Sequence, residues 1–212
     1  MQKKLWIAMT VLAILVSGYA VVQYYVLDAE KAGFVLQKLE AQQLERIWYG
    51  MLYAHIAGSV TALLLGSINM LKSVRERRPK LHRIMGRVYM AGIVLGGLSG
   101  AYLAFQATGG AVSTAGFLVL SIVWLLSGFW AVKTIRAKQA AQHRRWMIRN
   151  YALTLAAVSL RLWLALFVLA FGEENFVTSY TIISWLSWVP NALAAEWYIR
   201  RWGRGSSVPV GA

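Results

Sequence analysis

The sequence contains no cysteine among its 212 residues. Disulfide bonds, thiolate metal sites and catalytic thiols are therefore excluded, and cysteine usage gives no information on the redox compartment. Other chemical motifs are missing too: there is no glycine-rich phosphate loop, no GxSxG nucleophile elbow and no pair of carboxylates within an apolar segment. The sequence predicts no catalytic set and leaves open whether the protein is an enzyme.

Charged residues are scarce as well. They make up 14% of the chain, whereas 58% of the residues are hydrophobic, and a soluble domain of this length carries more charge. The apolar residues fall in blocks of about 20, the length that an α-helix needs to cross roughly 30 Å of hydrocarbon. The pattern predicts an all-α integral membrane protein, a six-helix bundle forming a single transmembrane domain over residues 1–212. The six spans are predicted at residues 5–27, 49–71, 86–106, 112–132, 146–171 and 176–199.

The segments between and around the spans are short. The first block begins like a signal peptide, but its apolar run continues to residue 27, beyond a poor cleavage site at Ala20, which favours a retained span. Residues 28–48 are mostly polar with few helix breakers, so we expect an outer loop that contains a short helix. Residues 205–212 are predicted to form a loose tail.

Acidic residues number eight against 22 lysines and arginines, which gives a formal net charge of +14. This excess does not indicate nucleic-acid binding, because the basic residues lie in short loops between the apolar blocks. Eighteen of the 22 fall on one side of the predicted topology, which is the positive-inside pattern. We therefore predict a multi-pass protein of the cell inner (plasma) membrane, surrounded by membrane lipids, with its N- and C-termini in the cytoplasm.

Small residues recur at every fourth position in two of the spans. Such stripes allow two helices to approach closely. They are typical of packing faces within a bundle, and they also suit docking to a membrane-protein partner or a second copy of the chain. The two stripes are Gly58, Ala62 and Gly66 in the second span, and Gly92, Gly96 and Gly100 in the third.

Two of the three histidines, His82 and His143, lie at the inner ends of the third and fifth spans. These spans are parallel, so we expect the two imidazoles at similar depth, where they would ligate the iron of a haem b. The arginines that follow each histidine would meet the haem propionates. Two alternatives stay open: the methionine one turn after each histidine would complete a copper site, or the His-Arg pairs bind lipid phosphates. The arginines are Arg83, Arg87, Arg144 and Arg149.

The third histidine, His55, and one arginine, Arg161, lie inside apolar spans. At 1.5 Å per residue, His55 is expected roughly 9 Å and Arg161 roughly 15 Å below the outer surface. An ionisable residue at such depth is costly and is a functional hypothesis by default. No acidic residue is expected at this depth, so Arg161 needs a carbonyl, a hydroxyl, water or an anionic ligand. We predict that His55 and Arg161 form a second polar site, for a quinone-like molecule or a haem propionate; the alternative is a structural arginine bonded to backbone carbonyls.

Several segments of the chain match a known family. They are the region of His55 with its small-residue stripe, LHRIMGRVY at residues 81–89, HRRWMIR at 143–149 and RLW at 161–163. Over nearly its whole length the chain resembles the bacterial membrane proteins grouped as domain of unknown function 2306 (DUF2306). The resemblance implies a membrane architecture and supports this choice of residues, and it names no reaction. A looser similarity is to six-helix transmembrane cytochromes b, which take electrons from ascorbate and hold two haems with four histidines; with three histidines, at most one paired-histidine haem fits here.

Three classes of function follow from these patterns. The leading hypothesis is a cofactor-binding protein in electron transfer, which holds haem b or a quinone-like hydrophobic molecule. The second is a non-redox transporter or a lipid- or anion-binding protein, in which Arg161 contacts an anionic substrate. The third is an assembly partner in a larger membrane complex, with the small-residue stripes as its docking faces.

Overall fold

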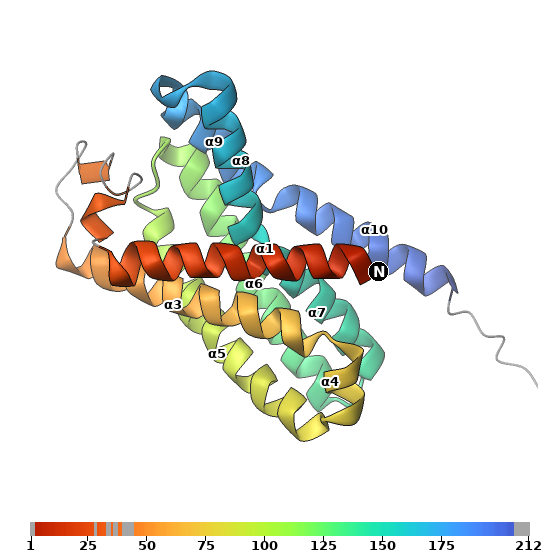
Figure 1. The fold of residues 1–212 in the computed structure, drawn as a ribbon. Helices are drawn as coiled ribbons and strands as arrows, with labels where there is room; N and C mark the ends of the chain where they lie inside the picture. The colour runs from red at the N-terminus through yellow and green to blue at the C-terminus, as the bar shows by residue number, and fades with distance from the viewer. Residues whose placement is uncertain (1–2, 28, 33–34, 36–37, 40–44, 206–212) are drawn as a thin grey trace, which may run out of the picture.

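The computed structural model describes residues 3–27, 29–32, 35, 38–39 and 45–205, and every regular element in this part of the chain is helical (Figure 1). The predicted all-α class is therefore confirmed. The predicted tail lies outside the described residues from 206 onward. The elements are α1 (Lys3–Val21), the π-helical turn η1 (Val22–Val26), the 3-10 turn η2 (Ala29–Lys31), α3 (Arg46–Asn69), α4 (Lys72–Arg77), α5 (Pro79–Ala104), α6 (Gly110–Arg136), α7 (Ala140–Thr154), α8 (Ala156–Phe171), the 3-10 turn η3 (Glu173–Asn175), α9 (Phe176–Leu186) and α10 (Val189–Gly205).

Five helical segments in the described part of the chain are long and apolar enough to cross a membrane. They coincide with the first five predicted spans, so the membrane assignment holds, while the number of six crossings stays a prediction. The third of these helices is longer than the hydropathy pattern indicates: α5 begins at Pro79, whereas the span is predicted from residue 86. The five segments are Trp6–Val26, Arg46–Asn69, Pro79–Ala104, Gly110–Arg136 and Ala140–Phe171.

The sixth predicted span is divided into two helices. The sequence pattern predicts one helix over residues 176–199, whereas α9 ends at Leu186 and α10 begins at Val189. The cause is Pro190, which has no backbone N–H to donate to a carbonyl of the preceding turn and whose ring crowds that carbonyl. The side chain of Asn191 compensates in part, since its Nδ2 donates to the carbonyl of Ser187 at 3.2 Å. A continuous helix over 176–199 is thus wrong, and α10 leaves the bundle at an angle to α9 (Figure 1).

The fifth predicted span, 146–171, is also interrupted. Leu155 lies between α7 and α8 with φ −67° and ψ −7°, a turn conformation outside the regular α-helical range. Its N–H still bonds to the carbonyl of Tyr151 at 3.0 Å, so the chain continues in the same overall course. The interruption divides this segment into α7, which carries His143, and α8, which carries Arg161.

The two stripes of small residues face each other between α3 and α5. A Cβ atom added at Gly58 would lie 2.5 Å from the backbone nitrogen of Gly96 and 2.6 Å from the carbonyl oxygen of Gly92. The backbones are therefore in direct contact, which only residues without a side chain allow. The prediction that these stripes are packing faces within the bundle is confirmed for this helix pair.

A buried polar network joins α5, α6 and α7. Asn150 of α7 is fully buried and accepts a hydrogen bond from the hydroxyl of Tyr89 at 2.6 Å. Its Nδ2 donates to the carbonyl of Trp124 and to the hydroxyl of Ser127, both at 2.8 Å. The indole of Trp124 donates to the hydroxyl of Thr154 at 2.9 Å. Because each group is satisfied by another, the network fixes the three helices relative to one another without exposing polar atoms to hydrocarbon.

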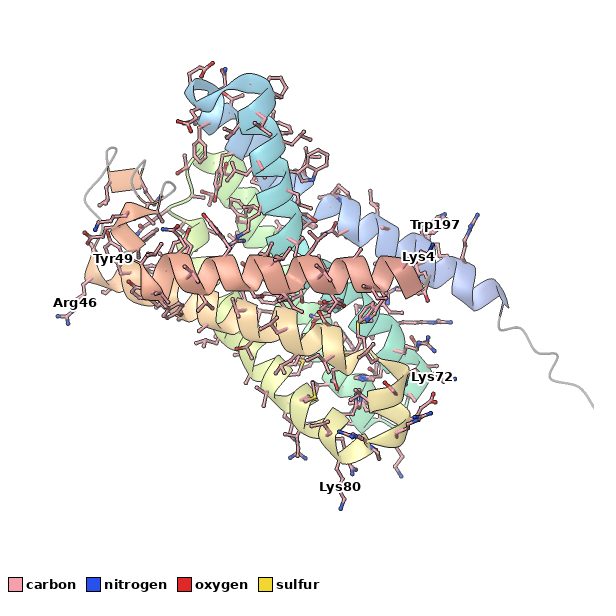
Figure 2. The ribbon with its side chains drawn as sticks, in the orientation of Figure 1. Lys4, Arg46, Tyr49, Lys72, Lys80 and Trp197 are labelled. Atoms are coloured by element: carbon pink, nitrogen blue, oxygen red, sulfur yellow. The ribbon has the colours of Figure 1, made fainter. Side chains whose placement is uncertain are left out.

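The two ends of the molecule differ in their labelled side chains. Figure 2 shows Lys4, Lys72 and Trp197 toward one end, whereas Arg46 and Tyr49 lie at the opposite end. Lys4 is in the first turn of α1, and Lys72 begins α4, separated from the end of α3 by two residues, so α1 and α3 run antiparallel. This arrangement agrees with the predicted grouping of basic segments on one side.

Candidate functional site

A cavity of about 630 Å³ lies between the helices in the half of the bundle nearest Tyr49. Its volume falls within the range of small-molecule sites, and most of its lining is apolar or aromatic, as in such sites. Side chains from α1, η1, α3, α5, α6, α7, α8 and α9 contribute to it. They include Tyr19, Tyr24, Trp48, His55, Phe117, Trp124, Thr154, Leu160, Arg161, Leu164, Phe176 and Tyr180.

His55 reaches this cavity from the middle of α3. Its Nδ1 lies 2.7 Å from the carbonyl oxygen of Gly96 on α5. Since a carbonyl can only accept, Nδ1 carries the proton and the Nε2 of the neutral ring keeps a lone pair. The ring also lies against Gly100, where an added Cβ would approach Nδ1 to 2.8 Å. The glycines of α5 therefore serve both the helix contact and the placement of this imidazole.

Arg161 reaches the same cavity from α8. It donates one hydrogen bond, from NH1 to the carbonyl of Ala157 one turn earlier, at 2.9 Å. Among the described residues no carboxylate lies within ion-pair distance of its guanidinium. The phenols of Tyr24 and Tyr180 are close enough to interact with its charge. The structure thus places His55 and Arg161 on one cavity. The bond to Ala157 uses only one of the five N–H donors of the arginine, so donors remain for a ligand.

Several residues of the cavity carry no signal in the sequence. Tyr24 belongs to the π-helical turn η1, a feature often found at functional sites and not visible from hydropathy. Trp124 and Thr154 resemble ordinary residues of apolar spans. Lys38 comes from the segment between α1 and α3 and is 5% exposed. It lines the cavity beside Gln106, and the Nζ of Lys38 donates a hydrogen bond to the carbonyl of Gln106.

The other two histidines lie at the opposite end of the bundle. His82 is in the first turn of α5 and His143 is in the first turn of α7, and their rings are close enough for their charges to interact. The Nδ1 of His143 bonds to the carbonyl of Ala131 at 2.8 Å, which leaves its Nε2 unprotonated in the neutral ring. The Nδ1 of His82 is buried without a partner among the described residues. Neither histidine lines the cavity that holds His55 and Arg161.

The arginines near these histidines have different surroundings. Arg83, Arg87 and Arg144 have exposed side chains. Arg149 instead forms a two-point ion pair with Glu196 of α10, with NH2 3.0 Å from Oε2, and its guanidinium lies 4.7 Å from the ring centre of Trp146. Arg149 therefore connects α7 to α10. Within the described part of the chain, no group of three or more His, Asp or Glu side chains comes together as a metal site.

The apolar helices and the interior cavity define an all-helical membrane protein. The chain belongs to the DUF2306 family, described as predicted membrane proteins, whose model matches residues 52–199. This range includes His55, His82, His143 and Arg161, which confirms the resemblance seen in the sequence. No curated protein and no solved structure matches the chain, and the looser likeness to cytochromes b stays a prediction.

Proposed function

We propose that this membrane protein binds a quinone-like molecule in the cavity and acts in electron transfer. One observation carries the proposal: His55 and Arg161, from different helices, line the same largely apolar cavity. A quinone has a flat apolar ring and carbonyl oxygens that accept hydrogen bonds. Arg161 has unused N–H donors for such an oxygen, and the aromatic rings of Trp48, Trp124 and Phe117 offer flat surfaces for the ring.

The two polar residues suit the two redox forms of such a ligand. In the oxidised form a carbonyl oxygen would accept hydrogen bonds from Arg161. In the reduced form a hydroxyl would donate to the lone pair on the Nε2 of His55, because Nδ1 is already bonded to Gly96. Oxidation of the quinol would release two electrons and two protons: the Nε2 of His55 would accept one proton, and water would take the other. The two electrons would pass, one at a time, to a separate redox protein or to the haem considered below.

The proposal is tested with protein purified in mild detergent and titrated with a short-tailed quinone such as decylubiquinone. We expect saturable quenching of tryptophan fluorescence, part of which disappears in Trp124→Phe because that indole lines the cavity. Arg161→Gln and His55→Ala should each raise the Kd at least tenfold, or about 1.4 kcal/mol. Arg87→Gln, on an exposed arginine outside the cavity, is the matched control and should leave the Kd unchanged. Quenching that does not saturate, or that is equal in all variants, would remove the proposal.

A second candidate, a haem b between His82 and His143, is supported by the bond from His143 to the carbonyl of Ala131. A haem-ligating histidine commonly donates its other ring N–H to such a carbonyl, which orients the ring and strengthens the ligand. In this arrangement Arg83 and Arg87, and with them Arg144, would be the arginines that meet the propionates, and Arg149 would have to leave Glu196 to do so. The haem would give the bundle a one-electron carrier at the end opposite the cavity.

An absorption spectrum of the purified protein, oxidised and then reduced with dithionite, tests the haem. The expected result is a Soret band with sharp reduced α and β bands that is lost in His82→Ala and in His143→Ala but retained in His55→Ala. A featureless spectrum from folded protein produced with ample haem would reject this candidate and leave the cavity as the remaining site.

The competing classes are a non-redox transporter or lipid- or anion-binding protein, and an assembly partner. The assembly hypothesis rests on lipid-facing glycines, but Gly92, Gly96 and Gly100 are buried between α3 and α5. This removes its main support. The transporter hypothesis shares the cavity with our proposal and differs in the fate of the ligand, which would be carried across the membrane and not oxidised or reduced.

A further inference from the structure

Lys38 is a second cation on the wall of the cavity. It is 5% exposed although it comes from the segment outside the long helices, and its Nζ donates to the carbonyl of Gln106, just beyond the end of α5. Both residues line the cavity. One bond to a neutral carbonyl leaves two of the three donors of an ammonium group for another partner.

Neither of the two cavity cations has a carboxylate partner among the described residues. The ion pairs in this part of the chain involve Glu76 and Glu196, both outside the cavity. Among the described residues, Glu173 is the one acidic residue that lines the cavity; it is exposed and forms no ion pair with Lys38 or Arg161. Burial lowers the pKa of Lys38, so an anion bound beside its Nζ would favour the charged form. The cavity therefore combines an apolar wall with an excess of positive charge.

We infer that the cavity selects a ring-shaped ligand that carries an acidic group, a carboxylate or an ionised ring oxygen, which Arg161 binds and whose charge Lys38 complements. This inference rests on the proposed binding of a flat apolar molecule, and it adds that the bound ligand is negatively charged. The physical reason is that a buried cation loses hydration and recovers stability when an anion pairs with it at short range. A neutral ring of the same size fills the same apolar space but leaves both cations unpaired.

A pair of probes that differ only in charge tests this inference. 2-Naphthoate and 2-naphthamide share one ring system, and the first carries a carboxylate where the second carries a neutral amide. Binding of each to the purified protein is measured by equilibrium dialysis against free ligand, so that partition into detergent micelles is subtracted. We expect naphthoate to bind at least tenfold more tightly than naphthamide.

Four variants locate the source of the preference. In Arg161→Gln the ratio of the two affinities should fall to near one, and in Lys38→Gln it should fall about threefold or more. Arg161→Lys keeps the charge and should retain most of the preference, which separates a charge effect from a packing effect. Lys80→Gln is the matched control, because Lys80 is exposed at the far end of the molecule from Tyr49 (Figure 2). If Arg161→Gln does not fold, Lys38→Gln and Arg161→Lys still decide the question.

The outcomes separate this inference from the proposed function. Equal affinities for the two probes, or a preference that survives in both Arg161→Gln and Lys38→Gln, overturns the anionic selectivity and leaves quinone binding intact. Binding of neither probe, with quinone quenching still saturable, also overturns the selectivity. If neither probe binds and the quinone titration is silent as well, the proposed function fails together with the inference.

Discussion

Gly100 has no side chain at the point where α5 passes the ring of His55. A Cβ at this position would lie 2.8 Å from Nδ1 and 3.0 Å from Cε1, so Gly100→Ala must displace the ring and weaken its bond to Gly96. We expect the Kd of the quinone probe to rise about tenfold, with tryptophan quenching as the measurement. The control is Gly50→Ala, where no atom lies within 4 Å of the added Cβ; an unchanged Kd in Gly100→Ala would show that the orientation of His55 is not needed for binding.

Asn150 holds the polar network in the middle of the bundle, and its side chain makes three of the hydrogen bonds in it. Asn150→Ala removes the bonds to the hydroxyl of Tyr89, the carbonyl of Trp124 and the hydroxyl of Ser127. Hydrogen bonds between membrane helices contribute about 0.6 kcal/mol each on average, so we expect the free energy of unfolding to fall by about 2 kcal/mol. Unfolding in sodium dodecyl sulfate measures the change. Asn175→Ala removes an exposed asparagine with one bond to the carbonyl of Phe171 and should cost less than about 0.5 kcal/mol; equal effects would contradict this role of the network.

The candidate site was predictable from the sequence only where a residue conflicts with its surroundings. His55 and Arg161 stand out because an ionisable group in an apolar span is costly. Tyr24 and Lys38 do not, since tyrosine at a span end and lysine in an outer loop are ordinary in membrane proteins. Tyr24 reaches the cavity from the π-helical turn after α1, and Lys38 reaches it from the segment between α1 and α3. Hydropathy reports neither placement.

The backbones of α3 and α5 touch at Gly58, which leaves no space there for a side chain. At Gly58 an added Cβ would meet backbone atoms of Gly92 and Gly96 at 2.5–2.9 Å, and backbone atoms cannot rotate away. Gly58→Ala should therefore lower the free energy of unfolding by about 1–3 kcal/mol, the usual cost of overpacking. The matched control is Gly18→Ala on α1, where no atom lies within 4 Å and alanine should be neutral or stabilising by up to about 1 kcal/mol. A neutral Gly58→Ala would mean that α3 and α5 separate easily.

At the level of helices, the sequence predicts the spans well where hydrophobic blocks are bounded by basic loops. It fails inside blocks, because hydropathy averages over about 19 residues and does not register a local break. The interruption at Leu155 has no proline or glycine to announce it. The interruption before Pro190 is marked by that proline, which favours two helices there over one continuous apolar helix.

For the whole molecule, the separation of basic segments toward one end implies that the two ends face different compartments. The absence of cysteine makes this testable, because a single introduced cysteine is the only thiol in the chain. Ser73→Cys on α4 and Asn175→Cys in η3 place exposed thiols near the two ends. We expect a membrane-impermeant maleimide to label Asn175→Cys in intact spheroplasts and Ser73→Cys only after the membrane is opened.

A third thiol decides whether the chain crosses the membrane five or six times. Arg201 is exposed on α10, close in sequence to Trp197, which lies toward the same end as Lys4 and Lys72 (Figure 2). If α9 and α10 together form a crossing, Arg201→Cys should behave like Ser73→Cys and stay unlabelled until the membrane is opened. Labelling of Arg201→Cys in intact spheroplasts, as for Asn175→Cys, would place the end of α10 outside. The topology would then have five crossings, and Glu196 of α10 would not lie on the same side of the membrane as Arg149. The six-crossing result keeps 18 of the 22 basic side chains on the cytoplasmic side, where the membrane potential and anionic lipids favour them.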